Sequence, residues 1–240
     1  MTDMLYQKDS YLKEFPGVIT LVDDEKHAIC LDQTAFYPGG GGQPHDTGWL
    51  IHNNISLEVI GMKKIGDDIW HFIDPISKLP NIGTQVVGKL NWERRYQLMR
   101  THSAMHVLCG VVFRDYGALV TGGNMDPLEG RMDFEFESLS KDLVQIIEDA
   151  VNTEIEIDHP VQVQILPREV AFQIPDLIRT KINLLPPNIT EIRTIEIVGL
   201  DLQADGGTHV RSTAEIGKAK IADYKSKGKI NKRIYLKLQP

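Results

Sequence analysis

The amino-acid sequence predicts an α+β fold in which a small N-terminal β-barrel is followed by an α+β domain built on one long helix. The first 88 residues contain short apolar stretches separated by turn residues at close intervals, as in a small barrel. After residue 91 the apolar residues recur at helical spacing, and further helices and strands follow. We therefore expect a barrel domain over residues 1–88 and an α+β domain over residues 89–240.

The N-terminal stretches are expected to pair as strands. Residues 17–22 and 26–31 form a predicted hairpin around Asp23-Asp24-Glu25, and residues 55–62 and 69–73 are further predicted strands.

A glycine run, Phe36-Tyr37-Pro38-Gly39-Gly40-Gly41-Gly42-Gln43-Pro44, interrupts this β-rich region. It lacks the Gly-Lys-Ser/Thr end of a phosphate-binding P-loop. Two interpretations remain open. The run lets a ligand or another backbone segment approach closely, or it is a flexible connection between strands.

Residues 92–116 are predicted to form one long helix, because their apolar positions recur three and four residues apart. Asn91 can cap the start of this helix, and Gly117 can end it. The remainder predicts elements of both kinds. They are a strand at 131–136, a helix at 141–152, strands at 161–166 and 194–198, and a strand pair at 214–221 and 230–238.

Two histidines of the long helix, His102 and His106, suggest a metal site. Side chains four residues apart project from one face of a helix, so both imidazoles can reach one ion. The later segment Asp205-Gly206-Gly207-Thr208-His209 offers a carboxylate and a third imidazole around a glycine turn. Three nitrogens and one oxygen suit zinc.

Each half of this pattern also has an ordinary structural interpretation. Histidines on the apolar face of a helix are mostly packed core residues, and the Gly-Gly segment alone would be a surface turn. Glycines are uncommon in core segments, so the two motifs together favour a metal site over an ordinary structural role. Four protein ligands would close the site in the structural manner, whereas a catalytic site needs an open position, and the sequence does not decide between them.

The segment Ala118-Leu119-Val120-Thr121-Gly122-Gly123-Asn124 directly follows the long helix. The Thr121 hydroxyl could exchange hydrogen bonds with a small polar ligand. Taken alone, the segment is better interpreted as a structural turn.

The composition is that of an ordinary globular protein, with 42% hydrophobic and 25% charged residues among 240. No apolar run approaches the roughly 20 residues that cross a bilayer, and the polar N-terminus lacks a signal-peptide core. Two cysteines, Cys30 and Cys109, are too few for a disulfide framework. We expect a cytoplasmic protein that makes no membrane contact.

The net charge of −7 is unevenly distributed. Residues 210–240 carry nine basic and two acidic side chains, or +7, and the remainder carries −14. The basic segment is either a solvated face or a surface that contacts phosphates. Its main members are Lys218, Lys220, Lys225, Lys227, Lys229, Lys232, Arg233 and Lys237.

In the segment Arg100-Thr101-His102-Ser103-Ala104-Met105-His106-Val107, the segment Gly206-Gly207-Thr208-His209-Val210 and the glycine run, the chain resembles the alanyl-tRNA editing proteins of the AlaX type. These are similar to the editing domain of alanyl-tRNA synthetase. The glycine run, with Asp46-Thr47-Gly48 after it, matches the longer members that carry an N-terminal barrel, so the resemblance covers nearly the whole chain.

The resemblance implies an aminoacyl-tRNA deacylase that hydrolyses tRNA(Ala) mischarged with serine or glycine. It implies zinc as the cofactor and an α+β editing domain after the barrel. It also assigns site residues. The zinc ligands map to His102, His106, Asp205 and His209, with the two helix histidines and Thr121 as the catalytic residues. Thr121 contacts the amino-acid moiety, and Gly40, Gly41 and Gln43 line the pocket. From the charge of the basic segment, we expect Lys225, Lys227 and Lys229 to help hold the tRNA acceptor stem.

The chain departs from the family at Asp205, where cysteine is common. A carboxylate can bind zinc but is a harder ligand than a thiolate. Two other functions stay open: a non-catalytic tRNA-binding module with a structural zinc, and a metal hydrolase that acts on a small ester. The first predicts deacylation unaffected by His102→Ala, and the second predicts a rate independent of salt.

Overall fold

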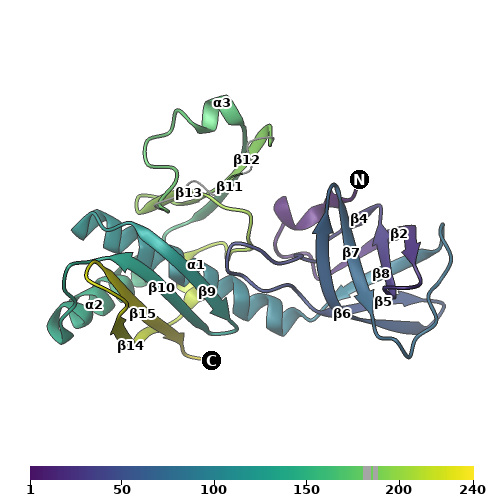
Figure 1. The fold of residues 1–240 in the computed structure, drawn as a ribbon, viewed down its shortest axis with the longest axis horizontal. Coiled ribbons are helices and arrows are strands. Elements are labelled where there is room, and N and C mark those ends of the chain that lie inside the picture. Colours follow the sequence, from purple (N-terminus) through teal and green to yellow (C-terminus); the bar gives the residue numbers. More distant parts are fainter. Residues whose placement is uncertain (181–184, 186–188) are drawn as a thin grey trace. The chain divides into compact units, whose positions relative to one another are not determined.

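A computed structural model describes residues 1–180, 185 and 189–240 (Figure 1). The chain forms two compact units, Met1–Tyr96 and Gln97–Pro240, which are described separately below. The division falls within helix α1 (Trp92–Tyr116), so the first turn of this helix belongs to unit 1 and the rest to unit 2. The expected α+β fold with a barrel is confirmed. The domain boundary between residues 88 and 89 stays a prediction.

Unit 1 is a closed β-barrel with the strand order β2-β3-β7-β6-β5-β8. The four predicted strands are confirmed, and β5 and β8 complete the barrel without having been predicted. The strands are β2 (Glu14–Asp23), β3 (Ala28–Leu31), β5 (Gly48–His52), β6 (Ile55–Ile65), β7 (Asp68–Ile73) and β8 (Gln85–Leu90). Beside them, β1 (Asp3–Met4) pairs in parallel with β4 (Gln33–Thr34), and a short 3₁₀ helix η1 (Leu5–Gln7) follows β1.

The barrel interior is filled by alternate residues of its strands. In β7 and β8 every second side chain is buried, as the two-residue period of a strand requires. Their inward residues join one apolar core with those of the other strands. Its largest members are Phe15, Ile19, Ile29, Leu31, Phe36, Leu50, Leu57 and Ile73.

The glycine run forms a loop that a buried ion pair closes. Gly39 to Gly42 all have positive φ, between 57° and 141°, which glycine adopts without strain. At the base of the loop the Tyr37 N–H donates to Asp46 Oδ2 at 2.7 Å, and the Asp46 N–H donates to the Tyr37 carbonyl at 3.0 Å. Arg95 donates to Asp46 and to two backbone carbonyls, and both charged side chains are almost fully buried.

Unit 2 contains most of α1, and beside it a four-stranded sheet ordered β14-β15-β10-β9 and a three-stranded sheet ordered β11-β12-β13 (Figure 1). The strands are β9 (Val120–Asp126), β10 (Glu129–Glu135), β11 (Val161–Pro167), β12 (Glu191–Ile197), β13 (Asp201–Ala204), β14 (Ala219–Ser226) and β15 (Asn231–Leu238). The other helices are α2 (Lys141–Ile157), α3 (Arg168–Ala171) and the 3₁₀ helix η2 (Thr213–Ile216).

The predicted ends of α1 are confirmed. Asn91 Oδ1 accepts a hydrogen bond from the Arg94 N–H at 3.3 Å, and Gly117 takes a left-handed φ of 64° after the last turn. None of the helices in the described part of the chain is long and apolar enough to cross a membrane.

Two local predictions are wrong. The segment 118–124, interpreted alone as a turn, contributes most of strand β9. Its glycines disfavour a strand, but pairing with β10 stabilises the extended conformation. The predicted strand at 214–221 starts too early. Ala214 to Ile216 belong to η2, where Thr213 donates its hydroxyl to carbonyls at the end of α2, and β14 begins at Ala219.

Candidate metal centre

Four side chains of unit 2 converge as the sequence predicts. His102, His106, Asp205 and His209 each offer one ligand atom, and these atoms lie within 4.8 Å of one another. The His102 and His209 rings are 4.2 Å apart between centroids, and the His106 and His209 rings 4.7 Å. All three imidazoles are buried, and the Asp205 side chain is 15% exposed. We call these four residues the metal cluster.

The Asp205 carboxylate is positioned by the turn that follows β13. Its backbone N–H donates to the Arg193 carbonyl at 3.1 Å, extending the pairing with β12. Its Oδ2 accepts from the Gly207 N–H at 2.7 Å, the pattern of an Asx-turn. This places Oδ2 3.0 Å from His209 Nε2 and leaves Oδ1 3.5 Å from His102 Nε2.

Two of the three imidazoles have their Nδ1 atom engaged away from the centre of the cluster. His106 Nδ1 lies 3.3 Å from Asp201 Oδ2, and His209 Nδ1 lies 3.1 Å from Ser103 Oγ. Ser103 is itself fixed, because its Oγ accepts from the Val210 N–H. In both rings Nε2 is therefore the nitrogen left for a metal, the usual arrangement of metal-bound histidines.

Burial and the neighbouring charges shift the pKa values in the cluster. Burial lowers the pKa of His102 well below its ordinary value and that of His209 to about 4. Burial also opposes the charged form of His106, but the hydrogen bond to Asp201 and the charge of Asp205 outweigh it and raise the His106 pKa. At Asp205, burial is outweighed by the neighbouring histidines, which hold its pKa well below the usual range.

The donor set fits a divalent cation. Two of the imidazoles favour the neutral form and the carboxylate favours the anionic form, which are the states in which these groups bind metals. Three imidazole nitrogens and one carboxylate oxygen are ligands that zinc accepts. The cluster can therefore hold a metal ion.

The other predicted site residues lie outside the metal cluster. Thr121 is exposed on β9, and its hydroxyl donates to Asn231 Oδ1 at 2.9 Å. Gly40, Gly41 and Gln43 belong to the glycine loop of unit 1, where Gln43 is buried and pairs through its backbone with Gly40.

The three predicted tRNA-binding lysines, Lys225, Lys227 and Lys229, are exposed at the end of β14 and in the turn before β15. Three other basic residues of this segment are engaged within unit 2. Lys232 donates to two carbonyls of that turn, Arg233 pairs with Asp133, and Lys237 pairs with Glu129.

The sequence interpretation missed the residues that surround the metal cluster. Asp201 of β13 contacts His106, and Arg193 of β12 contacts Asp205. Gln203 of β13 and Arg179 of the segment after α3 contact Asp201 in turn. One signal was present: Asp201, Gln203 and Asp205 alternate, so an extended strand presents all three on one face.

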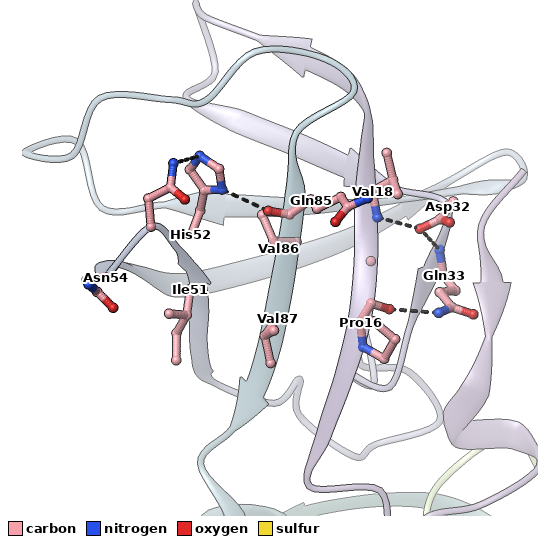
Figure 2. A pocket seen from close by; sticks show the side chains of 12 residues that line it. Pro16, Val18, Asp32, Gln33, Ile51, His52, Asn54, Gln85, Val86 and Val87 are labelled. Carbon is pink, nitrogen blue, oxygen red and sulfur yellow. Dashed lines mark hydrogen bonds between the residues drawn. The ribbon is translucent and has the colours of Figure 1, made fainter.

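The surface of unit 1 also has a hollow of about 650 Å³, shown in Figure 2. Its polar side chains hydrogen-bond to the neighbouring backbone: His52 to the Gln85 carbonyl at 2.9 Å, Gln33 to the Pro16 carbonyl at 2.7 Å, and Asp32 to the Val18 N–H at 2.7 Å. None of the predicted site residues lines this hollow.

Two family models of tRNA synthetases match parts of this chain, which carries a barrel and a three-histidine, one-carboxylate cluster. Residues 11–94 match the family model of class II (A) tRNA synthetases, and residues 192–235 match the threonyl and alanyl tRNA synthetase second additional domain. The second match includes Asp205, His209 and the three lysines.

Sequence comparison with individual relatives identifies the family. The chain is 41% identical to an alanyl-tRNA editing protein AlaX-M of Saccharolobus solfataricus, over 100% of both chains. It is 37% identical to the protein of the same name from Methanosarcina acetivorans, over 99% of both. An alanine–tRNA ligase of Pyrobaculum aerophilum is 37% identical over 92% of this chain and 25% of the ligase. The chain belongs to the family of alanyl-tRNA editing proteins.

Proposed function

We propose that this protein is an aminoacyl-tRNA deacylase that hydrolyses seryl-tRNA(Ala), and glycyl-tRNA(Ala) as a second substrate, with zinc held by His102, His106, Asp205 and His209. The convergence of the four donors in one buried cluster carries the proposal. Family membership supports tRNA(Ala) as the partner, because the relatives are named alanyl-tRNA editing proteins. The expected cytoplasmic location stays a prediction.

The reaction is the hydrolysis of the ester between the amino acid and the terminal ribose. Water adds to the ester carbonyl, the ribose oxygen leaves and takes up a proton, and serine and free tRNA are released. A zinc ion held by the cluster would supply a Lewis acid that could anchor the substrate and polarise its carbonyl. The protein's own part is to hold two of the imidazoles and the carboxylate in place. Ser103 contacts His209, Asp201 contacts His106, and the Gly207 N–H donates to Asp205.

We assign the recognition of the serine hydroxyl to Thr121. A site that hydrogen-bonds the serine hydroxyl favours serine over alanine, because alanine cannot make that bond. The Thr121 hydroxyl is exposed and its present partner is another side chain, Asn231, which a substrate can replace. Thr121→Val should therefore lower the preference for seryl over alanyl esters, and an unchanged preference would exclude this role.

The test compares hydrolysis of Ser-tRNA(Ala) and Ala-tRNA(Ala) by the wild type and by His102→Ala, with added zinc and with a chelator. We expect fast, serine-selective, metal-dependent hydrolysis that the substitution abolishes. His52→Ala, which removes an imidazole of the unit 1 hollow, is the matched control and should retain full activity.

One observation favours a second function, a tRNA-binding module with a structural zinc. Four protein donors can fill a tetrahedral zinc site completely, as structural sites do. Zinc binding and tRNA binding without hydrolysis under any metal condition would establish this alternative.

A further inference from the structure

Asp201 is a charged residue next to the metal cluster that the proposed ligand set does not use. It begins β13, and its side chain is fully buried. Its Oδ2 lies 3.3 Å from His106 Nδ1 and accepts from Gln203 Nε2 at 2.6 Å, while its Oδ1 accepts from Arg179 Nε at 3.4 Å. The His106 imidazole therefore lies between this carboxylate and the centre of the cluster.

We propose that Asp201 is the positioning residue of His106, fixing the tautomer and the ring orientation that present Nε2 to the metal. The proposal rests on the proposed metal site. A carboxylate can only accept hydrogen bonds, so the proton of a neutral His106 lies on Nδ1, and the lone pair lies on Nε2. Carboxylate partners of this kind orient metal-bound histidines in many sites.

The surroundings of Asp201 are built to hold the carboxylate in place. A buried carboxylate is costly unless donors surround it, and here a guanidinium, an amide and an imidazole do so. The Arg179 guanidinium is held in turn, because it stacks over the Phe113 ring of α1 at 3.7 Å.

Close contact between α1 and the β12–β13 turn brings Asp201 within reach of His106. Gly110 lies one helical turn beyond His106, on the same face. A Cβ at Gly110 would lie 3.0 Å from the Cβ of Asp201 and 2.9 Å from Leu200 Cγ. The missing side chain therefore lets the turn that carries Asp201 approach the helix.

A purely structural role, as the buried partner of Arg179, is the competing explanation. The two roles predict different effects of Asp201 on metal binding once His106 has been removed. If Asp201 acts through the imidazole, removing His106 should abolish the effect of Asp201 on metal binding. If Asp201 only stabilises the fold, its effect should persist without His106.

The experiment measures zinc affinity by competition with a chromogenic chelator, and the absorption spectrum of the cobalt(II)-substituted protein. The variants are Asp201→Asn, Asp201→Ala, His106→Ala and the double variant Asp201→Asn/His106→Ala. Glu154→Gln is the matched control, because Glu154 is also a buried carboxylate between an arginine and a histidine, outside the cluster. Circular dichroism and thermal unfolding of the metal-free proteins check the fold.

We expect both Asp201 variants to bind zinc about 10- to 100-fold more weakly, with a changed cobalt spectrum, and the control to match the wild type. In the His106→Ala background, Asp201→Asn should have no further effect. If Asp201→Ala fails to fold, the nearly isosteric Asp201→Asn and the double variant decide the question.

Wild-type zinc affinity and an unchanged cobalt spectrum in folded Asp201→Asn would overturn the inference, as would an equal loss of affinity with and without His106. A wild type that binds neither zinc nor cobalt would instead contradict the proposed metal site. The two failures are therefore distinguishable.

Discussion

Asp205 supplies the negative charge of the metal cluster, and it stands where the family resemblance places a cysteine. Its two oxygens differ in their surroundings. Oδ2 accepts from the Gly207 N–H at 2.7 Å, whereas Oδ1 lies 3.5 Å from His102 Nε2. Oδ2 thus stabilises the turn and also lies 3.0 Å from His209 Nε2, while Oδ1 faces His102. A single thiolate sulfur cannot reproduce this arrangement.

We predict that Asp205→Ala lowers zinc affinity by at least about 100-fold, since even outer partners of metal ligands cost 10- to 100-fold. Asp205→Cys should restore zinc binding, because thiolates are good zinc ligands, but should lower the thermal stability of the metal-free protein by removing the turn hydrogen bond. Chelator competition and thermal unfolding measure both effects. Equal zinc affinities of Asp205→Ala and the wild type would remove Asp205 from the ligand set.

At the scale of elements, the long helix could be predicted fully and the barrel only in part. Trp92–Tyr116 has continuous helical periodicity and both end signals, which local sequence can carry. Strand β8 was missed because Gly88 weakens its strand pattern. The glycine is required by packing, because a Cβ there would lie 2.3 Å from the Phe15 ring in the barrel core.

The metal cluster shows the same limit. The two histidines of α1 and the Asp205 to His209 segment are local motifs, so their chemistry could be predicted. Arg193 contacts Asp205 of the cluster, and Arg179 contacts Asp201 beside it, only through strand pairing and chain packing. No local pattern marks either residue. Residues that act through tertiary contacts therefore escaped a prediction based on spacing.

Gly110 gives a prediction about the approach of α1 to the β12–β13 turn. Alanine is favoured over glycine in a helix by about 1 kcal/mol, so Gly110→Ala would stabilise an isolated helix. Here the new Cβ would lie 2.9 Å from Leu200 Cγ, and overpacking of this kind costs about 1–3 kcal/mol. We expect lower thermal stability and weaker zinc binding, as the turn that carries Asp201 is displaced. Gly61→Ala, whose Cβ would meet only ordinary contacts at 3.7 Å, is the control.

The buried pair of Asp46 and Arg95 gives a second prediction for elements. Asp46→Ala leaves the Arg95 guanidinium, which is 0% exposed, without its carboxylate. Removing one partner of a buried pair costs about 3–5 kcal/mol. We expect a lower urea midpoint for unit 1 and faster proteolysis in the glycine loop. Asp3→Ala, which breaks an exposed pair with Lys8, should cost about 1 kcal/mol or less, and equal midpoints for the two variants would contradict the prediction.

The contact of α2 with α1 should depend on pH. Burial opposes the charged form of Glu154, but the hydrogen bonds from Arg114 and His159 outweigh it and lower the Glu154 pKa. A lowered carboxyl pKa adds stability that is complete above the unfolded value of about 4.3 and is lost as the pH falls through the folded value. Glu154→Gln should thus lower the free energy of unfolding at pH 7 by about 1–2 kcal/mol. The loss stays this small because Arg114 is 45% exposed, so solvent partly screens its interaction with Glu154. In urea titrations this difference should shrink below about pH 4, and a constant difference would contradict the assignment.

At the scale of the whole molecule, the charged residues are unevenly distributed along the chain. The protein carries −7 overall, yet residues 210–240 carry +7. Unit 2 neutralises part of this segment internally, through Arg233 with Asp133 and Lys237 with Glu129, while Lys227 and Lys229 stay exposed in the turn between β14 and β15. Lys227 and Lys229 therefore leave exposed positive charge at this turn, whereas Lys225 pairs with Asp223 at 3.1 Å.

We predict that the triple variant Lys225→Ala, Lys227→Ala, Lys229→Ala binds tRNA more weakly and with a smaller dependence on salt. Each lost phosphate contact removes about 0.7–0.9 from the slope of log affinity against log salt, so the slope should fall by about two to three. Zinc content should not change, because these exposed lysines lie outside the metal cluster. The matched control replaces Lys63, Lys64 and Lys78, also exposed, and changes the net charge equally. Equal slopes for the two triple variants, measured by filter binding between about 50 and 200 mM salt, would show that the tRNA acceptor stem contacts another surface.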